Sequence, residues 1–209
     1  MQPNPIHTIF EDSISATVQK LDELGYFKYA KKNDLEELKT EVFNSLKNEG
    51  YLSTIHIEEA PYNSKDFRHY WLDGEALFEP DGFTNYFKDF GHFFKMIDMK
   101  FIITNHIEEW DAENEILNHS ITINNKEYAI FTNFNGIGWS EAAKRFAEIL
   151  NDQFIIQGKD EKIYLASGGN DGYAVILTEA QFNLLDPLLN ASADRPLKIE
   201  DWCKFMQIN

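Results

Sequence analysis

Cysteine is nearly absent from this sequence, since Cys203 is the only one among 209 residues. A single thiol cannot form an internal disulfide, so the chain suits a reducing compartment. No apolar run approaches the roughly 20 residues that a membrane-spanning helix needs. The N-terminal stretch MQPNPIHTIF has neither the basic region nor the apolar region of a secretory signal. We therefore expect a cytoplasmic protein that does not enter a membrane.

Basic residues are also few: 19 Lys and Arg face 35 Asp and Glu, which gives a formal net charge of −16. Such a surface repels nucleic acid and anionic membranes. It attracts basic proteins and accelerates their association at low salt. Acidic surfaces also keep many cytosolic proteins soluble without any such partner. The acidic surface thus serves either solubility or partner binding, and both interpretations stay open. If it serves binding, the predicted partner is a basic protein.

Motifs for common cofactors and catalytic centres are missing from the sequence. The chain has no H-E-x-x-H, no C-x-x-C, no G-x-S-x-G and no dinucleotide-binding fingerprint. Its glycine-rich stretch SGGNDG, residues 167–172, lies between two strand-like runs, whereas a phosphate loop leads from a strand into a helix. That pattern favours a hairpin turn. The leading interpretation therefore includes no cofactor, no catalytic residue and no metal ligand.

Aromatic residues, by contrast, are abundant, and the 17 Phe and 9 Tyr argue against disorder. Apolar residues at helical spacing predict helices over residues 8–24 and 34–49, the second capped by Asn33 with Glu36. A third helix follows Asp81, and its aromatic stripe predicts a place in the core. That stripe consists of Phe83, Phe87, Phe90, Phe94 and Ile97, joined by Tyr86 and Phe93.

Two further helices have recognisable N-caps. Ser140 is expected to cap one, and Thr178 with Gln181 forms the capping box of another that ends near Pro187. The segment IEDWCKFM near the C-terminus predicts a last short helix.

Strand signals occur mainly as hairpins. YLSTIHI and MKFIITNHI read as strands, and ITINNKEYAIFTNF reads as a hairpin that turns at Asn124 and Asn125. Further hairpin turns are expected at Gly158 and at residues 167–172. We therefore predict an α+β fold with an antiparallel or mixed sheet, built largely from hairpins and packed against several amphipathic helices. The chain, residues 1–209, is expected to form a single domain with a weak seam near residues 60–80.

The tetrapeptide His-Ile-Glu-Glu occurs twice, beginning at His56 and at His106, and in each copy a predicted helix precedes the predicted strand that contains the histidine. Alternation along a strand places His56 with Glu58 on one face, and His106 with Glu108 likewise. If these strands paired, imidazoles and carboxylates would meet in a set that suits Zn²⁺ or Fe²⁺. A metal-dependent enzyme is therefore the alternative function. The competing interpretation is two strand ends that run into acidic loops.

The second copy leads into EEWDAENE, residues 108–115, in which acidic residues surround Trp110. Tryptophan is enriched in binding hot spots, and carboxylates around it would select a basic partner. The alternative is a solvated loop with its Trp in the core. The predicted partner-binding residues are Glu108, Glu109, Trp110, Asp111, Glu113 and Glu115.

The chain as a whole resembles the immunity proteins that bacteria pair with secreted polymorphic toxins. The resemblance lies in the acidic α+β character, in the Trp110 segment and in the pattern NKEYAIFTNFNGIGWSEAAKRFAEILN. It implies a cytoplasmic inhibitor that binds a basic toxin domain, such as a nuclease, and blocks its active site. An acidic mimic of DNA is a further alternative.

Overall fold

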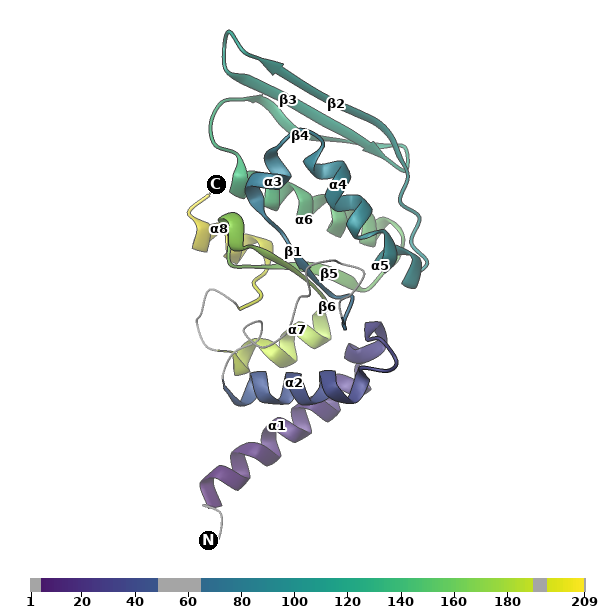
Figure 1. Cartoon of the computed structure of the whole chain (residues 1–209), viewed down its shortest axis with the longest axis vertical. Coiled ribbons are helices and arrows are strands. Elements are labelled where there is room, and N and C mark those ends of the chain that lie inside the picture. Colours follow the sequence, from purple (N-terminus) through teal and green to yellow (C-terminus); the bar gives the residue numbers. More distant parts are fainter. Residues whose placement is uncertain (1–4, 49–64, 190–194, 209) are drawn as a thin grey trace.

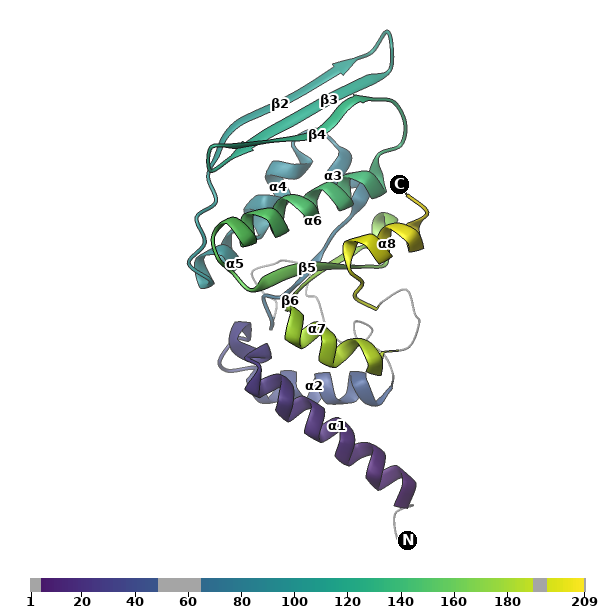
Figure 2. The same ribbon diagram turned by 180° about the vertical axis from the view of Figure 1, so that it is seen from behind.

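Sheets and helices alternate along the long axis of the molecule (Figure 1). The computed structural model describes residues 5–48, 65–189 and 195–208, and the side chains from residue 12 onward. One three-stranded sheet lies at one end, helices α3 to α6 follow, and a second three-stranded sheet comes next (Figures 1 and 2). Helices α7, α2 and α1 cover the other side of that second sheet. The predicted α+β class is confirmed.

The elements have the following bounds. The helices are α1 (Pro5–Glu23), α2 (Leu35–Lys47), α3 (Gly74–Phe78), α4 (Gly82–Asp89), α5 (Gly91–Met96), α6 (Trp139–Ile156), α7 (Glu179–Leu185) and α8 (Ile199–Met206). Short 3-10 helices occur at η1 (Tyr26–Tyr29), η2 (Gly169–Asp171) and η3 (Asp186–Leu188). The strands are β1 (His69–Trp71), β2 (Ile103–Asp111), β3 (Ile116–Ile123), β4 (Lys126–Phe134), β5 (Glu161–Ala166) and β6 (Tyr173–Thr178).

The central sheet has the order β1-β6-β5, and all its pairs are antiparallel. Both of its faces are buried, because its side chains alternate between two apolar clusters. Ile163, Leu165 and Ile176 point into the cluster that contains the phenylalanines. Tyr164 and Leu177 point to the opposite side, into the cluster shared with α1, α2 and α7. The hairpin expected at residues 167–172 joins β5 to β6 and is confirmed.

The outer sheet has the order β2-β3-β4 and is likewise antiparallel. Asn124 and Asn125 both have positive φ angles, 50° and 68°, at the β3–β4 turn, as predicted. The expectation that the second His-Ile-Glu-Glu segment is a strand end that runs into an acidic loop was wrong. Strand β2 continues to Asp111, and β3 begins at Ile116, so the acidic segment is the closed end of a hairpin.

The aromatic stripe after Asp81 is confirmed as core. It forms two short helices, α4 and α5, that meet at Phe90, which is fully buried. The ring of Phe146 from α6 stacks on Phe87 at 4.7 Å between centroids and also meets Phe83 and Phe90 edge-on. This aromatic layer lies between the two sheets and supports the inner face of the outer sheet.

Three local predictions were wrong. Helix α6 begins at Trp139 after Gly138, without a side-chain cap from Ser140, and α2 begins after Asp34 without the Asn33 cap. The hairpin expected at Gly158 does not form, since the preceding residues complete α6. The Thr178–Gln181 capping box and the C-terminal helix α8 are confirmed. The predicted strand over residues 51–57 and part of the predicted seam lie outside the described residues.

No helix in the described part of the chain combines the length and the apolar character needed to cross a membrane.

Candidate functional site

The predicted partner-binding residues occupy the closed end of the β2–β3 hairpin. Strand alternation divides them: Glu108 and Trp110 lie on the face turned toward the helices, whereas Glu109 and Asp111 lie on the opposite, exposed face. The carboxylates therefore do not encircle Trp110 as expected. Glu113 and Glu115 are exposed in the turn. Asp111 stabilises that turn, because its Oδ1 accepts hydrogen bonds from the backbone N–H groups of Glu113 and Asn114.

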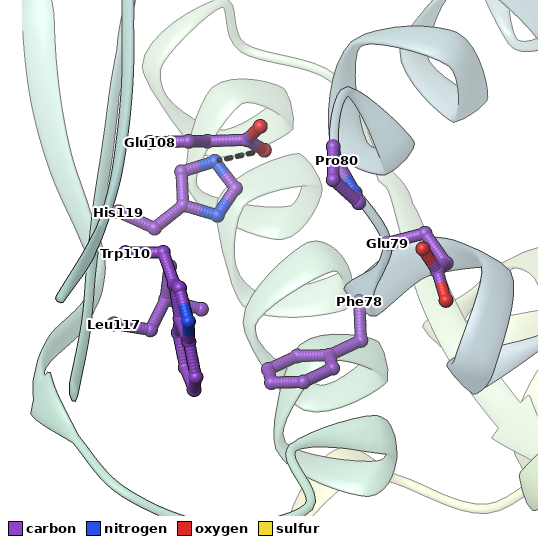
Figure 3. Close-up of a pocket in the computed structure, with 7 residues that line it drawn as sticks. All are labelled: Phe78, Glu79, Pro80, Glu108, Trp110, Leu117 and His119. Atoms are coloured by element: carbon purple, nitrogen blue, oxygen red, sulfur yellow. Dashed lines mark ion pairs between the residues drawn. The ribbon is translucent and has the colours of Figure 1, made fainter. Parts of the chain in front are cut away.

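Trp110 is exposed rather than buried, with 57% of its surface accessible to solvent. Its indole forms one wall of a pocket of about 330 Å³ between the hairpin and the chain that links α3 to α4 (Figure 3). Leu117 lies beside the indole, and Phe78 and Pro80 face it from the other side. We call this space the Trp110 pocket; it is lined by Phe78, Glu79, Pro80, Glu108, Trp110, Leu117 and His119.

At one end of the Trp110 pocket, three ligand-type atoms converge. The Nε2 atoms of His106 and His119 are 3.0 Å apart. Glu108 Oε1 lies 3.2 Å from the first and 3.3 Å from the second. No other group of three such side chains with this convergence occurs in residues 12–48, 65–189 and 195–208.

The hairpin register explains why these three side chains meet. Glu108 is directly opposite His119 in the β2–β3 ladder, and His106 precedes Glu108 by two residues on the same face. Sequence reasoning missed His119. A signal existed, because ILNHSITI alternates and places His119 in line with Leu117 and Ile121. Finding its partner required the hairpin turn at residues 112–115, where the sequence predicts a solvated loop.

His119 is held rigidly by its surroundings. Only 5% of its surface is exposed, and its ring meets Phe83 edge-on at 5.1 Å between centroids. Burial, together with the nearby His106, lowers the pKa of His119 to about 4. Its imidazole is therefore neutral at physiological pH and retains one nitrogen lone pair.

Asp81 lies in the turn that precedes α4 and contacts two side chains of β2, those of Glu108 and His106. Its backbone N–H donates a hydrogen bond to Glu108 Oε2 at 3.0 Å, which leaves Oε1 directed toward the two imidazoles. Its own Oδ1 lies 3.7 Å from Nδ1 of His106. Asp81 has a left-handed backbone with φ of 62°, and this conformation aims both groups at the hairpin.

Of the alternative site predicted from the two His-Ile-Glu-Glu segments, the structure describes the residues of the second segment. His106 and Glu108 share one face of a strand, as predicted. His56 and Glu58 lie outside the described residues. The residue that the structure brings to His106 and Glu108 is His119, which belongs to neither segment.

Comparison with protein-family models, with curated protein sequences and with solved structures gives no match for this chain.

Proposed function

We propose that this protein binds a basic partner protein, and that the Trp110 pocket receives a cationic side chain of that partner. The observation that carries the proposal is an exposed indole in a pocket that also contains carboxylates. Trp110 and Phe78 offer aromatic surface for the alkyl stem of Lys or Arg. Glu79 and Glu108 offer negative charge for its head group. A cation over an indole ring is further stabilised by the ring quadrupole.

The surroundings of the pocket favour the same partner. The chain carries a formal net charge of −16, and Glu109, Asp111, Glu113 and Glu115 extend the negative charge over the end of the hairpin. Long-range attraction of this kind accelerates association with a basic surface. The indole would then supply the short-range contact that slows dissociation.

Within this proposal, the protein is a cytoplasmic immunity protein that neutralises a basic toxin domain. The support is the resemblance of the whole chain to such proteins, together with its acidity and the exposed Trp110. Inhibition would follow if the hairpin end covered the basic groups with which the toxin holds its own anionic substrate.

A site-specific cross-linking experiment tests the proposal. A photoreactive phenylalanine analogue is placed at Trp110 in one sample and at Trp71 in the control, and each protein is irradiated in lysate of its host. Trp71 is a matched control because it is also partly exposed, at 43%, and lies on the other sheet. We expect position 110 alone to capture a protein with a basic isoelectric point. Capture of an acidic protein, or equal capture at both positions, would contradict the proposal.

The captured partner then allows a kinetic test of the indole. We expect Trp110→Ala to raise the dissociation rate and to weaken binding by about 2 kcal/mol or more, as loss of a buried aromatic hot spot does. Trp71→Ala should leave both rate constants unchanged. Because Trp110 is exposed in the free protein, the variant should remain folded, which circular dichroism can verify.

A further inference from the structure

We propose that His106, Glu108 and His119 form a binding site for a divalent transition-metal ion, with Zn²⁺ as the best-fitting ion. The three ligand atoms are Nε2 of His106, Oε1 of Glu108 and Nε2 of His119. This inference does not depend on the proposed partner binding. A dication and a cationic side chain would both be attracted by Glu108, so the two ligands are expected to compete there.

The spacing of the three atoms matches a zinc coordination shell. Nitrogen and oxygen ligands lie ~2.0–2.1 Å from zinc, and two such ligands at tetrahedral angles are ~3.3 Å apart. The three observed separations are 3.0, 3.2 and 3.3 Å. An ion could therefore bind all three atoms with only small side-chain movements.

The donor set also selects the kind of metal. Two imidazole nitrogens and one carboxylate oxygen suit Zn²⁺ and Fe²⁺, whereas Ca²⁺ and Mg²⁺ require oxygen ligands. Three protein ligands leave at least one coordination position for water or for another ligand. Glu108 and His119 both line the Trp110 pocket, so that position would open into the pocket.

The groups around the ligands hold them in place, which a metal site requires. The backbone N–H of Asp81 donates a hydrogen bond to Glu108 Oε2, so that Oε1 faces the two imidazoles. The Asp81 carboxylate lies 3.7 Å from His106 Nδ1, the nitrogen that would remain free once Nε2 bound a metal. Carboxylates next to the outer nitrogen of a ligand histidine orient its ring and raise its basicity. Phe83 fixes the ring of His119 from the core side.

The same contacts could instead be a hydrogen-bonded cluster that shares protons among two imidazoles and a carboxylate. Zinc titration distinguishes the two possibilities. The purified protein is treated with a chelator, dialysed and titrated with Zn²⁺ by calorimetry, without any partner protein. We expect one tight site per chain. Glu108→Gln and His119→Gln should each weaken that site at least about 100-fold, since loss of a supporting group alone costs 10–100-fold.

Two substitutions of the same types serve as controls. Glu127→Gln removes an exposed carboxylate from strand β4, and His92→Gln removes an imidazole from α5. Both should bind Zn²⁺ as the unmodified protein does. His106→Gln provides a ligand variant with less risk to folding, because His106 is more exposed than the buried His119.

A parallel titration with Fe²⁺ under anaerobic conditions shows whether the site binds Zn²⁺ or Fe²⁺ more tightly.

A second measurement separates this site from weak binding at other carboxylates. Zn²⁺ should raise the melting temperature of the unmodified protein and of both controls, because it binds only the folded site. The melting temperatures of the three ligand variants should not respond. The proposal is overturned if the unmodified protein binds no Zn²⁺, or if folded Glu108→Gln and His106→Gln proteins bind it with unchanged affinity. Neither result would affect the cross-linking test of partner binding.

Discussion

At the scale of single residues, Glu161, the first residue of β5, is a buried acidic side chain outside the site. It is 6% exposed, and its Oε1 accepts hydrogen bonds from Lys28 at 2.7 Å and from the Tyr29 hydroxyl. These contacts tie η1 to the central sheet. Burial alone would raise the pKa of Glu161, but the hydrogen bonds from Lys28 and Tyr29 outweigh burial and lower it.

This shift predicts a pH-dependent contribution to stability. A carboxyl with a lowered pKa in the folded state stabilises the fold above its ordinary pKa of 4.5 and loses that contribution as the pH falls further. We expect Glu161→Gln to lower the free energy of unfolding by about 1.5–3 kcal/mol at neutral pH. The difference from the unmodified protein should shrink below about pH 4.5. Urea unfolding across this pH range measures both effects.

Glu148→Gln is the matched control for Glu161. Glu148 pairs with Arg145 on the exposed side of α6, and such surface pairs contribute about 0–1 kcal/mol. A loss at Glu161→Gln no larger than at Glu148→Gln would contradict the role assigned to Glu161.

At the scale of secondary structure elements, the corner between α3 and α4 determines the geometry of the site. Glu79 and Pro80 in this corner line the Trp110 pocket, and Asp81 orients Glu108. Gly82 allows the corner to be tight. A Cβ atom at this position would lie 2.4 Å from the carbonyl oxygen of Leu77 and 2.5 Å from that of Ala76. Both contacts are to backbone, which cannot move aside as a flexible side chain would.

We therefore expect Gly82→Ala to destabilise the protein by about 1–3 kcal/mol, as overpacking does. Gly91, at the start of α5, is the matched control, because an added Cβ there meets no atom within 4 Å. Gly91→Ala should leave stability unchanged or raise it by up to about 1 kcal/mol, since Ala favours helix. Thermal and urea unfolding of both variants provide the comparison. Equal effects of the two substitutions would show that the corner is not sterically constrained.

At the scale of the whole molecule, negative charge and shape together define the proposed binding end. The outer sheet lies at one end of the long axis, and helices α1 and α2 lie at the other (Figure 1). If the hairpin end docks on a basic partner, its carboxylates should steer the encounter. Charges far from the contact should matter less, because salt screens them over a Debye length of about 8–10 Å.

This predicts an effect of charge position rather than of net charge. Neutralising Glu109, Asp111 and Glu113 together should slow association with the partner and flatten its dependence on salt. A control that neutralises three acidic residues of α1 and α2 removes the same charge from the opposite end. The control residues are Asp12, Asp22 and Glu36. Stopped-flow association rates over a range of salt concentrations test the prediction, and similar slowing by both triple variants would contradict it.

Sequence alone determined the elements whose signals are local. Strand-like runs on both sides of a turn predicted the hairpins at residues 124–125 and 167–172, because a strand buries every second side chain. The Asn124–Asn125 turn was predictable because Asn tolerates the positive φ angles of a tight turn. The Thr178–Gln181 capping box was predictable because its hydrogen bonds join residues only three positions apart. The aromatic stripe around Phe87 predicted core packing, since so much apolar surface is stable only when buried.

Tertiary structure alone decided the site. His106, Glu108 and His119 come together because of the β2–β3 register, and a strand shifted by one residue would turn its side chains to the other face. The corner that holds Asp81 depends on how α3 packs against α4, which local sequence does not specify. The exposure of Trp110 likewise depends on where the hairpin lies relative to the chain that links α3 to α4. The convergence of these side chains thus depends on strand register and on helix packing, whereas many of the individual strands and helices follow from local patterns.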